Sequence, residues 1–375
     1  MSRLAAAALI AAWPALLAAG SGCVEVAEGR ARRDARIGQA AAPGISVQAR
    51  GGLATVHELT PVTLHLWLQA PDVTLDLVTA AGAPPIEITA GNALSDAALG
   101  ALAPAAGVAV EPIAAAAGAP PTERRWRVTP PAGGGATTLR IAPPDAADAG
   151  PWRFAVFADV QEAIDRVQDI YRRMSQDAGI RFAVMSGDLT SRGTSEQLAR
   201  FRTEMTTGLP FPIYATLGNH ELGTREDLFH DYFGRGNFSF VYRNVQFTLL
   251  DTASATLAPV VYDWLGGWLI EGIDRAHFVF AHIPPLDPIG TRNGAFASRL
   301  EANKLLSLLA SGDVDTTFYG HVHSYYAYSN AGIPAYITGG GGAIPEQLDG
   351  IGRHYLTVDV DPTAQTSQVA IVRVD

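Results

Sequence analysis

The chain has 375 residues, of which 48% are hydrophobic and 17% are charged. This composition excludes a wholly disordered protein, and the 38 glycines and 24 prolines exclude a coiled coil. The length of the chain predicts two domains. Lys and Arg number 27 against 37 Asp and Glu, which gives a formal net charge of -10. The protein therefore has no general positive field for nucleic acid or an anionic membrane, and the sequence shows no local nucleic-acid patch.

The first 22 residues predict a secretory signal peptide. A short positive start ends at Arg3, an apolar run follows at residues 4–19, and small residues occupy positions 20–22. The apolar run contains Pro14 and is short beside the roughly 20 residues that a membrane-spanning helix needs. We therefore expect an exported protein, in the periplasm or at the cell surface.

Cys23 directly follows the predicted signal and is the only cysteine of the chain, so it cannot form an intramolecular disulfide. Its position is similar to that of the lipid-modified cysteine of bacterial lipoproteins, although Gly20 stands where these proteins usually carry an aliphatic residue. Two interpretations stay open, a lipid anchor on Cys23 and ordinary secretion with an incidental thiol. In the first, this lipid is the protein's only contact with a membrane.

The next part of the chain predicts a tether and a small β domain. Residues 23–43 are polar and Arg-rich without apolar periodicity, which predicts a flexible tether. Residues 44–145 alternate apolar and polar positions, as in Val62–Leu68 with its even-numbered side chains inward, and predict an all-β sandwich of a generic Ig-like kind. Periodicity is weak at residues 93–120, where we expect one short helix and long loops.

From residue 152 to residue 375 the pattern predicts a second domain of α/β class, because short apolar strands alternate with helical stretches. Thr194 is the expected N-cap of its second helix. The expected helices are residues 164–174, 195–205 and 299–309. The expected strands are residues 154–158, 182–185, 213–217, 247–250, 278–281, 316–319, 335–338 and 355–360.

Five of these strands run into polar turns, and the carboxyl ends of strands are where an open α/β sheet binds ligands. Each turn alone has an ordinary explanation, since Asp and Asn often bond their own backbone in turns. Together, however, the turns supply two carboxylates, one amide oxygen and three imidazoles, all suited to divalent transition metals. These residues are Asp159, Asp188, Asn219, His282, His321 and His323.

In their order, the turns resemble the motifs of the calcineurin-like metallophosphoesterases, which are Asp-x-His, Gly-Asp, Gly-Asn-His-Glu or Asp, a single His, and Gly-His-x-His. The resemblance covers residues 153–375 and implies a four-layer α-β-β-α sandwich with a two-metal site at the strand ends. The acid-phosphatase-like and cyclic-nucleotide-phosphodiesterase-like branches are both similar and are not separated by these motifs.

The resemblance also implies roles for individual residues. Asp188 would bridge two metal ions, and a hydroxide shared by them would attack phosphorus. His220 would be the catalytic residue that contacts phosphate oxygens or protonates the leaving group, while Glu221 would orient its neighbours. The ions could be Mn, Fe or Zn, divalent or trivalent. The ligand sets would be Asp159, Gln161, Asp188 and His323 for one metal, and Asp188, Asn219, His282 and His321 for the other.

Two positions depart from the family pattern. Gln161 stands where the family most often has histidine, and a neutral amide oxygen is a weaker donor than imidazole, so the affinity or identity of the first metal is expected to differ. Ser191 stands where purple acid phosphatases carry the tyrosine that colours their ferric site. A purple ferric enzyme is therefore not expected.

The resulting hypothesis is an exported, metal-dependent hydrolase of small-molecule phosphoric esters, either monoesters or diesters. The alternative is a surface binding lipoprotein whose hydrolase domain is inactive, with the sandwich as the working part. Gln161 favours the alternative, whereas the other ligand residues and His220 are all present and favour the enzyme. Metal content and turnover of a simple phosphate ester would distinguish the two.

Overall fold

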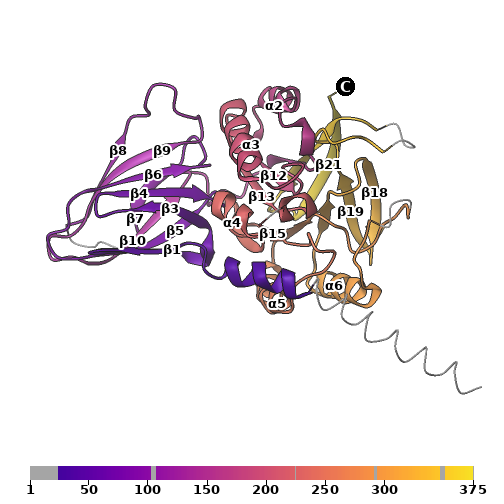
Figure 1. The fold of residues 1–375 in the computed structure, drawn as a ribbon, viewed down its shortest axis with the longest axis horizontal. Helices are drawn as coiled ribbons and strands as arrows, with labels where there is room; N and C mark the ends of the chain where they lie inside the picture. Colours follow the sequence, from indigo (N-terminus) through magenta and orange to yellow (C-terminus); the bar gives the residue numbers. More distant parts are fainter. Residues whose placement is uncertain (1–23, 103–106, 224, 291–293, 347–350, 375) are drawn as a thin grey trace, which may run out of the picture.

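A computed structural model describes residues 24–102, 107–223, 225–290, 294–346 and 351–374. The predicted signal peptide and Cys23 lie outside the described residues. A β-sandwich and an α/β domain lie next to each other, with the N-terminal helix along one side of both (Figure 1). Within the described ranges, none of the helices combines the length and the hydropathy that a membrane crossing requires.

The sandwich consists of two five-stranded sheets, with strand orders β1-β2-β5-β10-β7 and β3-β4-β6-β9-β8. The strands are β1 (Gln39–Ala42), β2 (Ile45–Ala49), β3 (Ala54–Leu59), β4 (Thr63–Leu68), β5 (Val73–Thr79), β6 (Ile86–Gly91), β7 (Ala98–Ala101), β8 (Ala109–Ile113), β9 (Arg124–Thr129) and β10 (Gly135–Ala142). The core between the sheets includes Leu64, Leu66, Leu75 and Leu139, so alternation along the strands gives this domain its buried face.

The structure differs from the sequence prediction in two parts of the sandwich. The described part of residues 93–120 forms β7 and β8 and contains no helix. Both are short edge strands with few buried side chains, so they leave little periodic signal. Val62 is 48% exposed, whereas Trp67, expected on the outer face, is buried because its ring meets Phe233 of the α/β domain at 5.9 Å.

The α/β domain also contains two sheets, with strand orders β13-β12-β11-β20-β21 and β14-β15-β16-β17-β19-β18. Its strands are β11 (Trp152–Phe157), β12 (Ile180–Ser186), β13 (Ile213–Thr216), β14 (Phe238–Tyr242), β15 (Val245–Leu250), β16 (Ala276–Ala281), β17 (Thr316–Tyr319), β18 (Tyr325–Asn330), β19 (Ile333–Thr338), β20 (His354–Asp361) and β21 (Thr366–Arg373). All eight strands expected from the sequence are present; β14, β18 and β21 were not predicted.

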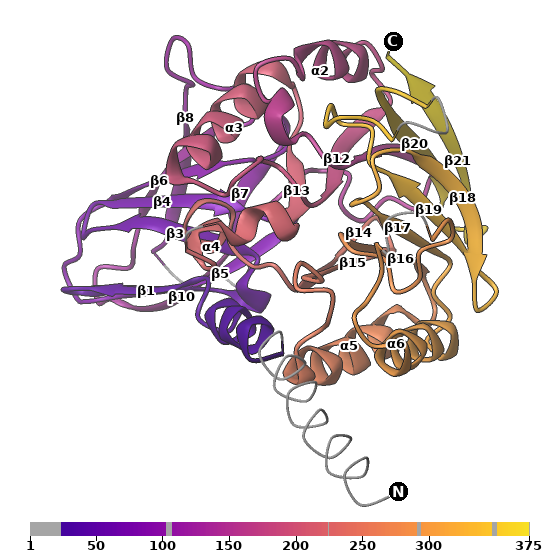
Figure 2. The ribbon, with the colours of Figure 1, turned by 45° about the vertical axis from the view of Figure 1, so that its right-hand side comes forward.

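Helices cover the outer faces of these two sheets, which confirms the predicted four-layer α-β-β-α architecture (Figure 2). The first sheet is covered by α2 (Gln168–Ser175), α3 (Ser195–Gly208) and α4 (Leu228–Phe233), and the second by α5 (Pro259–Gly272) and α6 (Arg299–Ser311). Thr194 caps α3 as predicted, because its side chain accepts a hydrogen bond from the Gln197 amide. The first predicted helix begins late, at Gln168.

Between the two sheets lies an aromatic core, to which each strand contributes alternate side chains. Along β11, Phe154 packs into this core while Phe157 points to the helix side. The Phe154 ring lies 5.1 Å from the Phe247 ring and 5.4 Å from the Phe278 ring of the opposite sheet. These contacts hold the sheets face to face and so fix where their edges meet.

The central strands of both sheets are parallel, so their carboxyl ends come together at one edge. In the first sheet β11, β12 and β13 pair in parallel, and in the second β15, β16, β17 and β19 do so. Because the sheets are stacked, turns from five separate strands reach the same edge. The polar turns of the sequence analysis are the turns that meet there.

The segment expected to be a flexible tether, residues 23–43, instead contains a packed helix and, at Gln39–Ala42, strand β1 of the sandwich. It is helical from residue 24, where the described part begins, to residue 34. Ala27, Arg30, Ala31 and Asp34 lie on one face of this helix and are each at most 2% exposed. Two of these four buried residues, Arg30 and Asp34, are charged, so the sequence shows no helical periodicity of apolar residues. Their ionisable partners lie more than 190 residues away in the chain.

A buried polar network fixes this helix to the α/β domain. The Arg30 guanidinium donates to both oxygens of Asp251, at 2.6 and 3.1 Å. The Asp251 amide donates to the side-chain oxygen of Asn237, whose own amides donate to Asp34 at 2.8 and 3.0 Å. The Asp34 carboxylate also lies 3.0 Å from the ring of His230. The network joins the helix to β14, β15 and α4.

We expect Arg30→Met to lower the free energy of unfolding by about 3 to 5 kcal/mol, because it leaves the buried Asp251 carboxylate without its cation. The measurement is the denaturant midpoint of the purified protein. Arg32→Met is the matched control, since Arg32 is on the same helix but 63% exposed, and it should cost less than about 1 kcal/mol. Equal losses for both variants would contradict a structural role for the buried pair.

Candidate metal centre

The turns at the shared edge are bonded to one another across the two sheets. The His282 ring nitrogen Nδ1 lies 2.8 Å from the carbonyl oxygen of Ser186, at the end of β12. The His321 amide donates to both oxygens of Asp159, at 3.2 and 3.0 Å. The second sheet therefore contributes histidines directly over the carboxylates of the first.

Three of the predicted ligands form one tight cluster. Ligand atoms of Asp159, Asp188 and His323 all lie within 4.8 Å of one another, an arrangement that could hold a metal ion. The His323 nitrogen Nδ1 lies 2.7 Å from the carbonyl oxygen of Ile344, and its Nε2 lies 3.5 Å from Asp159. With Nδ1 donating its hydrogen to Ile344, the Nε2 lone pair is directed at the carboxylates.

Gln161 belongs to the same cluster, with its amide nitrogen turned inward. Nε2 of Gln161 donates to Oδ2 of Asp188 at 2.8 Å and lies 3.1 Å from Nε2 of His323. A half-turn of the terminal amide would present its oxygen, instead of its nitrogen, to the same space. The position fits a ligand at the first metal.

The other predicted ligands form a second cluster that also contacts Asp188. Nε2 of His282 lies 3.2 Å from Oδ2 of Asp188 and 3.0 Å from the side-chain oxygen of Asn219. The His321 ring centre is 5.2 Å from that of His282. The structure thus brings all seven predicted ligand residues together, and Asp188 touches both clusters.

His220 lies at the open side of the clusters. Its ring nitrogen Nδ1 lies 2.7 Å from the carbonyl oxygen of Ser191, and its Nε2 lies 3.9 Å from Oδ2 of Asp188. The side chain is 35% exposed, whereas His282 is fully buried. His220 is therefore accessible to a small molecule that approaches the two clusters.

Burial and mutual charge give the two aspartates different acidities. Burial, together with the charge of Asp188, raises the pKa of Asp159 well above its usual value. Burial alone would also raise the pKa of Asp188, but His282 and His220 lower it below the usual range. Burial lowers and the Asp188 carboxylate raises the pKa of His282, and the net result is about 9. Two ionised carboxylates are therefore unfavourable side by side in this buried space, and a cation between them would relieve that repulsion.

Four of the predicted ligand residues have left-handed backbone conformations. Their φ angles are 63° at Asp159, 48° at Gln161, 53° at Asp188 and 70° at His321. A non-glycine residue rarely adopts such angles, and the cost is of order 1 kcal/mol or more for each. The surrounding structure therefore holds these residues in unfavourable backbone conformations at the strand ends. There the conformations turn the four side chains toward one point.

The sequence did not predict several of the groups that hydrogen-bond to the metal-ligand residues and hold them in position. The carbonyls of Ser186 and Ile344 orient imidazoles, but a backbone group gives no signal in residue type. The Thr252 hydroxyl accepts the amide of His282, and its only signal is its place after a predicted strand. Glu221 accepts the amides of Thr190 and Gly218, which agrees with the orienting role expected for it.

The donor set fits a transition-metal centre by its chemistry. Nε2 of His282 lies 3.2 Å from Oδ2 of Asp188 and 3.0 Å from the side-chain oxygen of Asn219. These atoms are acceptors when the imidazole is neutral, so a cation or a proton must lie among them. Carboxylate, amide oxygen and imidazole are ligands that Mn, Fe and Zn accept.

Comparison with known proteins identifies the family of the α/β domain. Residues 153–325 match the model of the calcineurin-like phosphoesterases. The chain carries a calcineurin-like phosphoesterase domain. The matched residues contain all seven predicted ligands and His220. No curated protein matches the chain at a significant level.

Two solved structures are similar to this chain at low sequence identity. The purple acid phosphatase PPD1 from yellow lupin (Lupinus luteus) seeds has a TM-score of 0.53 and 13% identity, over 81% of this chain and 70% of that one. A dimetal phosphatase from Danio rerio has a TM-score of 0.43 and 15% identity, over 60% of this chain and 99% of that one. The lupin match is too extensive for the phosphoesterase domain alone, so the likeness includes part of the sandwich.

We expect the first metal site to respond to residue 161 in a fixed order. Gln161→His should bind metal more tightly than the natural protein, and Gln161→Ala should bind it at least about tenfold more weakly, because imidazole is a stronger donor than an amide and alanine has none. A chelator-competition titration measures this, with Gln176→His at an exposed position as the control. Equal affinities for all variants would show that residue 161 is not a ligand.

Proposed function

We propose that this protein is an exported hydrolase of small-molecule phosphoric esters that uses two metal ions. The family match of residues 153–325 supports the general class, and the dinuclear chemistry is our proposal. The single observation that supports it best is the position of Asp188. Its Oδ2 lies 2.8 Å from Gln161 of the first cluster and 3.2 Å from His282 of the second. One carboxylate at that place can bind two cations and offset their repulsion.

Two ions bound there would supply positive charge for phosphate oxygens and lower the pKa of water to near neutrality. The chain's own residues would do the rest. His323 and His282 each have Nδ1 placed to donate to a backbone carbonyl, which holds their Nε2 atoms toward the centre. The bonds of Asp188 and Asp159 to the amides of His220 and His321 keep both carboxylates in place.

His220 is the residue we propose for contact with the substrate. Its Nδ1 is placed to donate to Ser191, so Nε2 is free to face a phosphate oxygen or the leaving oxygen. The side chain is partly exposed and close to both clusters, and its Nε2 lies beyond hydrogen-bond distance of Asp188, at 3.9 Å. A protonated His220 can give its Nε2 proton to the departing alkoxide.

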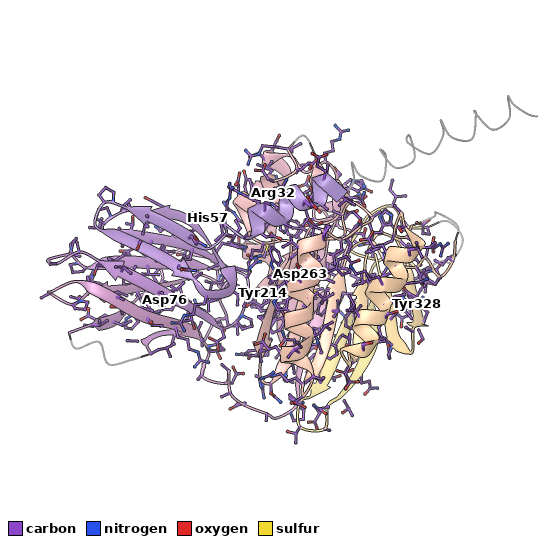
Figure 3. The ribbon with its side chains drawn as sticks, turned by 90° about the horizontal axis from the view of Figure 1, so that it is seen from below. Arg32, His57, Asp76, Tyr214, Asp263 and Tyr328 are labelled. Carbon is purple, nitrogen blue, oxygen red and sulfur yellow. The ribbon has the colours of Figure 1, made fainter. Side chains whose placement is uncertain are left out.

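The first test is metal content. The purified protein incubated with manganese or zinc should contain two ions per chain, and Asp188→Asn should lose both, because each cluster contacts that carboxylate. The exposed aspartate on α5, labelled in Figure 3, gives the control Asp263→Ala, which should keep both ions. Elemental analysis that finds no metal in the natural protein would refute the two-metal proposal.

The second test is turnover of p-nitrophenyl phosphate and bis-p-nitrophenyl phosphate, which also separates monoesterase from diesterase. We expect His220→Ala to lower kcat by about 10² to 10⁴ while leaving the metal content unchanged. His65→Ala changes a half-buried histidine of the sandwich, far along the chain from the predicted ligands, and should leave kcat unaltered. A metal-loaded protein that hydrolyses neither ester would instead favour the alternative of a binding lipoprotein.

We also propose that the protein is anchored by a lipid on Cys23, in the periplasm or at the cell surface. The support is the signal-like sequence of residues 1–22 and the position of the single cysteine directly after it. In a bacterial host that processes lipoproteins, the natural chain should fractionate with membranes and Cys23→Ser should be released from them. Natural protein found only in the soluble fraction would refute the anchor.

A further inference from the structure

A cavity of about 690 Å³ lies where the N-terminal helix, the sandwich and the phosphoesterase domain meet. Its walls come from the end of the N-terminal helix, from β3 of the sandwich, and from α3 and α4. Figure 3 labels His57 of this cavity on the side of the sandwich that faces the other domain, near the N-terminal helix with Arg32. None of the predicted metal ligands lines it.

The charge of this cavity is strongly one-sided. Four arginines line it against a single carboxylate, that of Asp231. Asp231 already accepts from two of them, Arg33 at 2.7 Å and Arg225. The lining therefore has an excess of positive charge in a protein whose net charge is -10.

The other two arginines, Arg36 and Arg202, have no carboxylate partner among the residues that the structure describes. The Arg202 guanidinium lies 5.3 Å from the Tyr232 ring centre and 5.8 Å from that of Trp67, so aromatic faces hold it in position. This leaves its N–H groups free for an anion. Arg36 follows the end of the helix and is exposed on the cavity wall.

We propose that this cavity binds a small molecule that carries two or more phosphate groups, held by Arg36 and Arg202. Guanidinium groups pair with phosphate through two parallel N–H bonds, and here they approach from two different elements. The hydroxyls of Ser195 and Tyr232 also line the cavity; they are hydrogen-bonded to each other, which leaves one hydroxyl hydrogen for a ligand. The proposal goes beyond the phosphoesterase activity and does not depend on it.

The size of the cavity selects a small molecule over a polymer. Sites for small ligands typically have volumes of about 300 to 1,000 Å³, and this cavity falls within that range. A nucleic acid would need positive charge along an extended surface, whereas these arginines are gathered around one hollow. Because Arg36 and Arg202 are both without a carboxylate partner in the described part of the chain, the cavity matches an anion with several negative charges, such as a polyphosphate, better than a monovalent anion.

The test is calorimetric titration of the purified, chelator-treated full chain with pyrophosphate. Removal of metal prevents both chelation of the probe and binding at the metal centre. We expect one site with a Kd below about 1 mM and weaker binding of orthophosphate. Arg36→Gln combined with Arg202→Gln should weaken pyrophosphate binding at least about tenfold, because two charge-assisted contacts are lost.

Arg172→Gln combined with Arg173→Gln is the matched control, since both arginines are exposed on α2 outside the cavity, and it should bind as the natural protein does. Three outcomes would each overturn the proposal. Pyrophosphate binding could fall equally in both double variants, it could require restored metal, or malonate could bind as tightly as pyrophosphate. If the first double variant fails to fold, Arg36→Glu decides, because this exposed side chain has no stacking role and its reversal should abolish binding.

Discussion

Two carboxylates, Asp159 and Asp188, are buried close together at the edge where both sheets end, and this constraint governs the centre. Water cannot solvate these carboxylates there, so hydrogen-bond donors and positive charges must stabilise them instead. Amides of His220 and His321 donate to them, and imidazoles approach from the opposite sheet. The same demand explains why left-handed backbone is retained at several turns and why a metal centre suits this edge.

A second buried charge pair links the N-terminal helix to the phosphoesterase domain. Arg30 reaches Asp251, and the residue after Asp251 is Thr252, whose hydroxyl accepts the amides of His282 and Ile283. The helix is thus connected by a short path to a predicted metal ligand. If Cys23 bears a lipid, the anchor would be directly followed by a rigid element, and the orientation of the phosphoesterase toward the membrane would be restricted.

The sequence predicted the strands of the α/β domain well because these strands are buried on both faces, whereas the four-layer arrangement was implied by the family resemblance. Phe154 and Phe157 point to opposite sides of β11, yet both are apolar, so such a strand reads as a continuous apolar run. The N-terminal helix was missed for the opposite reason. Its buried Arg30 and Asp34 read as solvent-exposed charges until their partners are known, and edge strands such as β7 bury too little to leave a pattern.

By itself the sequence determined the fold class and the candidate ligands, because the order of apolar strands and polar turns is local information. The family resemblance implied which ligands share Asp188, but only the tertiary structure decided how close they lie, since that depends on how two sheets stack through contacts such as Phe154 with Phe278. It also decided that residues 24–34 are packed and that Arg36 and Arg202 line one cavity. Charges far apart in the chain acquire partners only when packing brings them within a few Å, and no local pattern encodes that distance.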